Sequence, residues 1–355
     1  MEKRILIVLA ACFYYSGIIR LACWWKRRQG PYLTILNYHQ AAEGGELREH
    51  LLYLRRRYRV MHLDAALDEL YTPNKNRSAR TERRAPIVVT LDDGYKDNYT
   101  HGLKAASELQ TPITIFLIPG YLDSGARFWW LEADYLLAHT QVSEATLEGK
   151  TYHLNQPGER AELLHCINQR VRNAASVAER ETFIQLARQA LGNPTGMTDQ
   201  ERLALPMTWE EALEMDKSEW VSFGAHTVHH PILGYLANPE ETAYEVHESH
   251  TMLEQRLGHP LRSFAYPVGW LDQAGYYGIR AVHETGFDWA VTTVYGFNTP
   301  ETDPYLLRRI ETDVNEHWLI IAAKASGVWD SFTHMVRVLT MRTPAHTREV
   351  KGTNN

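Results

Sequence analysis

Cysteine is scarce in this chain of 355 residues, which contains only Cys12, Cys23 and Cys166. No two of them form a CxxC pair, so the sequence offers neither a cysteine-based metal site nor a framework of disulfide bonds. Basic charge is not in excess either, since 37 Lys and Arg residues are outnumbered by 43 Asp and Glu residues. Nucleic acid is therefore not expected as a partner. Internal repeats and low-complexity tracts are missing, and nothing indicates an obligate protein partner.

Long apolar runs are missing except at the N-terminus. Ile5–Ile19 carries no charge, and after Arg20 the apolar run continues to Trp25. If the Arg20 side chain extends its charge to an interface, Ile5–Trp25 reaches the ~20 residues that a membrane-spanning helix needs. A helix that docks on the protein itself is the alternative.

The residues after this run also favour a membrane. Trp24 and Trp25 lie just before the basic segment Lys26–Arg28, as in an interfacial aromatic belt with a basic flank. No small-residue cleavage site follows the run, which argues against a removed signal peptide. We expect residues 1–30 to span or lie on a bacterial inner membrane, with the following domain on the cytoplasmic side, where the basic residues gather.

Beyond residue 30 the pattern alternates between strand-like and helix-like segments. Expected strands are 32–38, 86–91, 113–118, 220–225, 264–266 and 289–294, and expected helices are 47–58, 63–71, 101–109 and 274–285. Such alternation predicts a mostly parallel sheet, open or closed into a barrel. Residues 133–206 show no convincing strand and are helix-patterned. We therefore expect a domain over 31–315 with a helical insertion at about 133–206, and a C-terminal helix and tail over 316–355.

Two short motifs combine the residue types of a metal-dependent hydrolase. Asp92 and Asp93 end one strand-like run, and His226 and His230 follow another. Two imidazoles and one carboxylate are a common set for a divalent metal that keeps a position open for water or substrate. A second, adjacent carboxylate can accept the proton of that water, as hydrolysis requires.

Each motif alone has an ordinary structural interpretation. Asp-Asp-Gly is common in solvated turns, and two histidines four residues apart are more often a coincidence of the surface or a packed pair. The strand context favours the functional interpretation, because barrel and open α/β folds place their chemistry at the C-terminal ends of strands.

Longer stretches around these residues resemble a known family. Thr90–Gly94 (TLDDG) is similar to the T-F-D-D-G motif of polysaccharide deacetylases with NodB homology, also called carbohydrate esterase family 4. His226–Pro231 (HTVHHP) resembles their H-[S/T]-x-x-H-P motif, and Ser263–Gly269 (SFAYPVG) resembles a variant of the third motif. The Tyr-His pair that ends at His39 is similar to the end of the family's first strand. The resemblance runs from about Thr34 to Ile310.

This resemblance implies a distorted (β/α) barrel with fewer strands than an eightfold barrel, interrupted here by the helical insertion. It implies a hydrolase that removes N-acetyl, or sometimes O-acetyl, groups from a glycan, and the apolar N-terminus suggests a lipid-linked one. Transferred onto this sequence, Asp92 is the general base, and Asp93, His226 and His230 hold one divalent metal ion. Zinc is the expected ion, with cobalt, nickel or manganese as alternatives.

The third motif departs from the family pattern in a way that affects the base. Many members have R-x-P-Y-G, whereas this chain has Ala265 at the Arg position and Val268 at the Tyr position. The missing Arg normally steadies the base, and Arg309, from a later strand-like segment, is our candidate for that role. The family's late L-x-H motif, whose His protonates the leaving amine, is not evident, so the general acid stays unassigned. Three later histidines lie on expected helices and are interpreted as structural or exposed: His283, His317 and His334.

Four further residues are candidates for contact with the substrate or the transition state. A backbone N–H near Tyr266, beside Pro267, would help the metal to hold the oxyanion that develops during acyl transfer. His39 ends a strand at the side of the fold where site residues occur. Trp130, in an aromatic cluster, either stacks on a sugar ring or packs against the insertion.

Other functions share some of these features. Two His and one carboxylate also bind Fe(II) in oxygenases, but there a His and a carboxylate are close in sequence, whereas here the two His are close. A non-catalytic glycan-binding or assembly subunit would explain the altered third motif, although the intact set of Asp92, Asp93 and the two histidines argues against it. An amidase that acts on a small non-sugar amide would use the same residues.

Overall fold

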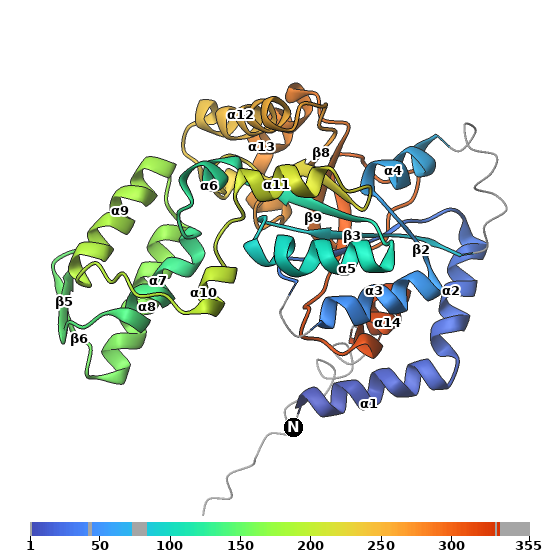
Figure 1. Ribbon diagram of the computed structural model, residues 1–355, viewed down its shortest axis with the longest axis horizontal. Coiled ribbons are helices and arrows are strands. Elements are labelled where there is room, and N and C mark those ends of the chain that lie inside the picture. The colour runs from blue at the N-terminus through green and yellow to red at the C-terminus, as the bar shows by residue number, and fades with distance from the viewer. Residues whose placement is uncertain (1, 42–44, 73–83, 331, 334–355) are drawn as a thin grey trace, which may run out of the picture. The chain divides into compact units, whose positions relative to one another are not determined.

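The computed structural model describes residues 2–41, 45–72, 84–330 and 332–333 (Figure 1). The chain divides into two compact units. The larger unit is formed by Gly30–Glu316, and the smaller one combines the described residues before residue 30 with those from His317 onward. The expected C-terminal tail, with His334, lies outside the described residues.

Seven parallel strands close into a barrel in the larger unit. Around the ring the order is β1, β10, β9, β8, β7, β4 and β3, and β3 pairs again with β1. The bounds are β1 (Thr34–Tyr38), β3 (Pro86–Leu91), β4 (Ile113–Leu117), β7 (Val221–Ala225), β8 (Ser263–Ala265), β9 (Trp289–Tyr295) and β10 (Leu307–Glu311). A short further strand, β2 (Arg59–Met61), pairs with the first half of β3. This is the distorted (β/α) barrel that the family resemblance implies, and it decides between the open and closed sheets that the pattern of segments allows.

Three neighbouring strands of the barrel, β1, β3 and β4, are mostly apolar and buried on both faces. Every residue of β1 and β4 is buried, as is all of β3 except its first residue. Such continuous apolar runs are typical of parallel strands that are covered on both sides. Since all barrel strands run in one direction, the residues that follow them gather at one end of the barrel. His39, Asp92 and His226 directly follow β1, β3 and β7, respectively.

Helices connect the strands of the barrel. Their bounds are α3 (Glu46–Arg57), α4 (Leu63–Tyr71), α5 (Lys104–Leu109), α6 (Pro119–Ser124), α11 (Trp209–Asp216), α12 (Pro239–Leu257) and α13 (Leu271–Thr285), with a π-helical turn η2 (Asn98–Leu103) before α5 and a 3₁₀ turn η3 (Leu233–Tyr235) before α12. The helix α11 begins with a capping box. Thr208 Oγ1 accepts the N–H of Glu211 at 3.2 Å, and the Glu211 carboxylate accepts the N–H of Thr208 at 2.9 Å.

The insertion between β4 and β7 contains a strand pair that the sequence pattern did not predict. The strands β5 (Glu144–Leu147) and β6 (Lys150–His153) form an antiparallel hairpin. The expectation of a strand-free insertion is therefore wrong. The physical reason is that each strand has only four residues, and the pairing depends on the turn, where Glu148 and Gly149 have positive φ angles of 50° and 81°. A two-residue turn of this kind, with Gly second, closes hairpins.

Helices make up most of the insertion, which is drawn in green to yellow in Figure 1. They are α7 (Trp129–His139), α8 (Pro157–Arg172), α9 (Val177–Ala190) and α10 (Asp199–Leu203). Buried apolar residues of the first three helices pack with the hairpin into a hydrophobic cluster, which includes Leu136, Leu163 and Ile184. This separate cluster explains how so long an insertion folds without extending the barrel.

The smaller unit consists of α1 (Glu2–Tyr15), α2 (Ile18–Gln29) and α14 (Trp318–Ser326). The expected apolar helix over Ile5–Trp25 is not continuous. It breaks at Gly17, whose φ of 85° is typical of the residue that ends a helix. No single helix in the described ranges is long and apolar enough to cross a membrane, and α1 and α2 meet that criterion only as a pair bent by 62°.

Candidate active site

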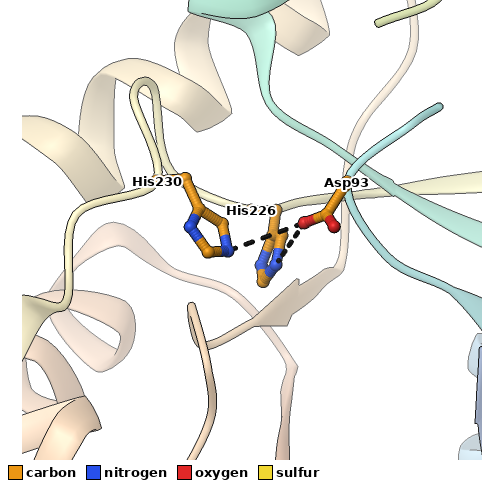
Figure 2. Close-up of side chains that lie close together, drawn as sticks. All are labelled: Asp93, His226 and His230. Carbon is orange, nitrogen blue, oxygen red and sulfur yellow. Dashed lines mark ion pairs between the residues drawn. The ribbon is translucent and has the colours of Figure 1, made fainter. Parts of the chain in front are cut away.

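Three potential metal ligands converge at the C-terminal end of the barrel. Asp93 follows β3, and His226 and His230 lie in the loop after β7. The Nε2 atoms of His226 and His230 lie 3.5 Å and 3.6 Å from Oδ1 of Asp93, and the three donor atoms are all within 4.8 Å of one another. Figure 2 shows both imidazoles beside the carboxylate. The structure thus brings together the three residues that the sequence analysis assigned to a metal.

The chemistry of this donor set fits a divalent cation. The three side chains are buried, and Asp93 Oδ1 has no hydrogen-bond partner among the described residues. A buried carboxylate oxygen without a partner is costly, and a cation would relieve that cost. Burial, helped by His226, lowers the pKa of His230 well below its ordinary value, so the imidazole is neutral, as ligation requires. Nδ1 of His226 lies 2.7 Å from the Ala265 carbonyl oxygen, which favours the tautomer with a free Nε2.

Asp92, next to Asp93, forms a buried ion pair with Arg309 of β10. Nη1 and Nη2 of Arg309 donate to Oδ1 and Oδ2 of Asp92, each at 2.7 Å. Burial favours the neutral acid, but the Arg309 guanidinium outweighs it, so the pKa of Asp92 lies below its ordinary value. Asp92 is therefore ionised and able to accept a proton. The structure places Arg309 at the carboxylate where the sequence analysis proposed it.

Neighbouring strands hold the Arg309 guanidinium in place. Its Nη1 also donates to Asn37 Oδ1 at 2.9 Å and to Thr90 Oγ1 at 3.2 Å, and its Nε donates to the Thr292 carbonyl oxygen at 2.9 Å. These acceptors lie on β1, β3 and β9. The orientation of the Asp92 carboxylate is therefore set by the barrel itself rather than by a loop.

The loop after β7 has a conformation that needs support. Thr227 and His230 have positive φ angles of 63° and 55°, which are uncommon for residues other than glycine. Buried Glu245 of α12 supplies one side of the support. Its Oε2 accepts the backbone N–H groups of Val228 and His229 at 3.0 Å and 2.8 Å.

The carbonyl groups of the same loop are held from the insertion. Arg180 of α9 donates to the His229 carbonyl oxygen at 2.9 Å and to that of His230 at 3.4 Å. Trp129 of α7 donates from Nε1 to the His230 carbonyl oxygen at 2.9 Å. A buried carboxylate thus binds the N–H groups of the loop, and a buried guanidinium binds its carbonyl groups.

Sequence reasoning missed both charged residues of this support. Glu245 lies on an ordinary charged helix and gave no signal. Arg180 did leave one, because it shares the buried face of α9 with three apolar residues at helical spacing, namely Phe183, Ile184 and Ala187. A charged residue within an apolar helical stripe is an exception that calls for a buried partner.

Trp130 is fixed between the insertion and the metal-ligand candidates. Its Nε1 donates to Tyr95 Oη at 2.8 Å, and burial, with the nearby Asp93 carboxylate, raises the pKa of Tyr95 well above its ordinary value. The Trp130 ring stacks on Phe128 at a centroid distance of 4.6 Å and lies 4.5 Å from the His230 ring. Trp130 therefore packs against the insertion and also lies beside the metal-ligand candidates.

These groups face a cavity of about 420 Å³. Besides the four motif residues, ten residues from the barrel and the insertion line its wall: Asn37, His39, Tyr95, Trp129, Trp130, Arg172, Val268, Trp270, Thr293 and Glu311. His39 and Trp130, both expected as site residues, are among them. Two expected residues, Tyr266 and Pro267, are not.

Tyr266 itself does not offer the free backbone N–H that the sequence analysis expected near it. The N–H of Tyr266 donates to the Val291 carbonyl oxygen at 3.2 Å, so it is not available to a substrate. Val268 lines the cavity and has a φ of 60°. Its N–H has no acceptor in the part of the chain that the structure describes. The free donor expected near Tyr266 is therefore at Val268.

Two of the three late histidines that the sequence analysis set aside, His283 and His317, are not among the described residues of the cavity wall, and the third, His334, lies outside the described residues. His283 lies on α13, and His317 caps the start of α14, where its side chain accepts the N–H of Leu319. Apart from His226 and His230, the cavity-lining imidazole in the described ranges is that of His39.

Comparison with known proteins places this site in a family. The family model of polysaccharide deacetylases matches residues 79–287, and a search of curated proteins finds no match. The solved structure of the deacetylase PplD from Streptococcus pyogenes, in complex with acetate, has a TM-score of 0.53 at 16% identity and covers 83% of this chain and 99% of its own. IcaB from Ammonifex degensii has a TM-score of 0.53 at 20% identity and covers 84% of this chain and 98% of its own. At these identities the likeness concerns the fold.

The family match spans more than half of the chain and includes Asp92, Asp93, His226 and His230. The chain belongs to the polysaccharide deacetylase family and is a carbohydrate deacetylase, a hydrolase that acts on C–N bonds other than peptide bonds.

Proposed function

We propose that this chain hydrolyses the N-acetyl group of a glycan in a metal-dependent reaction. The observation that carries the proposal is the buried set of Asp93, His226 and His230 beside ionised Asp92 at the wall of one cavity. The reaction adds water across the amide: a C–O bond forms, the C–N bond breaks, and acetate and a free amine are released.

Asp93, His226 and His230 would hold the cation, and zinc is our proposal because three N and O donors with one open position suit it. Cobalt, nickel or manganese are the alternatives. When bound, the cation supplies Lewis-acid chemistry, in that it acidifies water and polarises the scissile carbonyl. The neutral imidazole of His230 and the fixed tautomer of His226 prepare the site for that ion.

Asp92 is proposed as the general base. Its carboxylate accepts a proton from the attacking water, and Arg309 keeps it ionised and oriented. In this chain Arg309 would do the work of the Arg that the third motif lacks. The altered motif is therefore no argument for a non-catalytic binding or assembly subunit.

Two further roles follow from the cavity wall. The N–H of Val268 is proposed to donate to the oxyanion of the tetrahedral intermediate. His39 is proposed as the acid that protonates the leaving amine, since it is an imidazole in the described wall outside the ligand set. Hydrolysis of a small non-sugar amide would use the same groups, so the acceptor has to be tested directly.

We also propose that the smaller unit binds a membrane and that the glycan is lipid-linked. The first two helices expose several large apolar side chains, namely Ile5, Leu6, Val8, Tyr15, Ile18, Leu21, Trp24 and Trp25. Basic Lys26, Arg27 and Arg28 follow in the last turn of α2. Aromatic and basic residues in this order suit the interface of a bilayer, and a cytoplasmic location of the barrel remains our prediction.

The test is acetate release by the purified full chain with added zinc or cobalt. N-acetylglucosamine oligomers and a lipid-linked glycan extract serve as acceptors. We expect Asp92→Asn to bind one metal ion per chain with at least a ~100-fold loss of turnover, and His226→Ala to lose metal and turnover. His39→Gln should lose turnover while keeping the metal. No acetate from either pool, in a chain that binds metal, would leave the amidase or the binding subunit as the function.

A further inference from the structure

One charged residue of the cavity wall takes no part in the chemistry described so far. Arg172 lies in the last turn of α8, in the insertion, and lines the cavity together with Trp130. Its neighbour Val171 is buried in the hydrophobic cluster of the insertion. The end of α8 is thus anchored by packing, and Arg172, the next residue, forms part of the cavity wall.

The guanidinium of Arg172 has no ion pair or hydrogen bond to any residue that the structure describes. The other arginines of α8 and α9 differ from it. Arg170 pairs with Glu148 at 3.3 Å and with Glu179 at 2.6 Å, and Arg188 pairs with Glu132 at 2.7 Å. Arg160 donates to the Leu137 carbonyl oxygen, and Arg180 donates to the loop after β7. Among the arginines of these two helices, Arg172 is therefore the one whose guanidinium has no hydrogen bond or ion pair within the described residues.

The carboxylates at the metal-ligand candidates do not pair with Arg172 either. The Asp92 carboxylate is neutralised by Arg309, and Asp93 faces the two imidazoles. The remaining carboxylate of the described cavity wall, Glu311, lies on β10 and forms no ion pair with Arg172. The insertion side of the cavity is thus cationic. A planar guanidinium fork is suited to binding a carboxylate or a phosphate through two parallel hydrogen bonds.

We infer that the glycan carries an anionic group close to the acetamido group, and that Arg172 binds this group. The inference rests on the proposed deacetylation and adds the substrate class: an acidic acceptor rather than a neutral N-acetylglucosamine polymer. The anion is either the carboxylate of an adjoining uronic acid or a phosphate on the sugar, since both present two oxygens to the fork.

The experiment compares three acceptors that differ in charge. They are N-acetylglucosamine tetramer (neutral), an N-acetylglucosamine–glucuronate tetrasaccharide (carboxylate) and N-acetylglucosamine 1-phosphate (phosphate). KM and kcat are measured for the zinc-loaded full chain and for Arg172→Gln, Arg172→Lys and Arg170→Gln. Arg170→Gln is the matched control, because it removes one positive charge two residues away on the same helix, from a side chain that does not line the cavity.

Wild type should prefer one of the two anionic acceptors. Arg172→Gln should lose about 10–100-fold in kcat/KM for that acceptor through KM, the range for a lost charge-assisted hydrogen bond, and less than about twofold for the neutral tetramer. Arg172→Lys should recover part of the loss, and Arg170→Gln should behave as wild type. An equal loss on all three acceptors, or no preference for an anion in wild type, overturns the inference.

Equilibrium binding distinguishes failure of this inference from failure of the proposed deacetylation. If no acceptor releases acetate, calorimetric titration of the same three saccharides still tests Arg172. Tighter binding of an anionic saccharide that Arg172→Gln abolishes supports the anionic site without the reaction. Equal binding by wild type and Arg172→Gln refutes it.

Discussion

At the scale of single residues, the Asp92 carboxylate is paired with a charge that comes from a strand other than the one after which the third motif places its arginine. The third motif holds Ala265 where an arginine would stand, yet the guanidinium of Arg309, from β10, forms two 2.7 Å hydrogen bonds to Asp92. What matters for the proposed base is a cation against both carboxylate oxygens, and the strand that carries the cation can differ. Arg309 is itself fully buried. Removing either partner of the pair would therefore leave a buried charge without its counterion.

Replacing Arg309 should therefore change the pH dependence of the reaction. Arg309 lowers the pKa of Asp92 against the effect of burial, so in Arg309→Met burial dominates and the pKa rises. A larger fraction of the base is then protonated at acidic pH, and the acid limb of the kcat/KM profile moves to higher pH. The ion pair also stabilises the fold. Because the pKa of Asp92 is lower in the folded state than its unfolded value of ~3.9, this stabilisation is fully present above pH ~3.9 and is lost as the pH falls through the folded pKa. Arg309→Met should remove it.

The measurements are a pH–kcat/KM profile and the unfolding temperature at pH 7. We expect about 3–5 kcal/mol of destabilisation for Arg309→Met. Arg309→Lys, which keeps the charge but not the fork, controls for loss of the fold and should give an intermediate profile. A folded Arg309→Met with the wild-type acid limb would contradict the role of Arg309.

The residues to which we assign the chemistry were largely predictable, and those that position them were not. Asp92, Asp93, His226 and His230 stand at strand ends, where a parallel fold brings them together. Arg309 could be proposed because the third motif lacks its arginine, so another cation had to be sought for Asp92. Glu245 and Arg180 support the loop through backbone atoms, and a contact with a backbone atom leaves no pattern of residue types for sequence reasoning to find.

At the scale of elements, the insertion supports the loop after β7, which carries the two histidines. The helix α9 supplies Arg180 to the carbonyl groups of His229 and His230, and α7 supplies Trp129 to the same loop. The positive φ angles in this loop mean that it would relax without such contacts. The insertion therefore has a role in the site beyond covering the barrel.

We expect Arg180→Met to weaken metal binding about 10–100-fold, the usual cost of losing a group that orients a metal ligand. The measurement is zinc affinity by competition with a chromophoric chelator, which does not depend on turnover. Arg202→Met, on the exposed surface of α10, is the control for loss of a positive charge in the insertion. Unchanged zinc affinity in Arg180→Met would mean that Glu245 and Trp129 hold the loop alone.

Elements with a strong period were predicted to within a few residues, and short elements were not. The strand β3 and the helix α4 agree with the predicted ranges. The hairpin of β5 and β6 was missed because each strand has four residues, too few for alternation to stand out against a helical pattern. The break at Gly17 was missed because one glycine in an apolar run does not reveal whether its φ is positive.

At the scale of the whole molecule, the barrel class was predictable but its strand order was not. Alternating strands and helices imply a parallel sheet, and the resemblance indicated a barrel. The pairing of β1 with both β3 and β10, which closes the ring, joins segments far apart in the chain. Such pairing depends on packing between distant residues, which the local pattern of the sequence does not contain.

The smaller unit leads to a prediction about where the enzyme works. One face of α1 packs on α14 through Ala10, Leu319 and Ile320. With 14 and 12 residues, α1 and α2 are each shorter than the ~20 residues of a spanning helix. The 62° bend between them suits a pair that lies in the interface of a bilayer. Alkaline carbonate releases interfacial proteins from membranes but leaves spanning proteins in place. We therefore expect alkaline carbonate to release this chain.

Vesicle sedimentation tests this prediction quantitatively. Trp24 and Trp25 are 49% and 59% exposed, and burying such side chains in a bilayer contributes about 1.5–3 kcal/mol each, so Trp24→Ser with Trp25→Ser should lower partitioning at least ~100-fold. Arg27→Gln with Arg28→Gln should cost about 2 kcal/mol on anionic vesicles and much less on zwitterionic ones, because each basic residue contributes about 1 kcal/mol near an anionic surface. Leu186→Ser, at a 49% exposed residue of the insertion, should leave binding unchanged. If the two tryptophan changes do not alter partitioning, these helices do not bind the membrane, and the case for a lipid-linked acceptor loses its support.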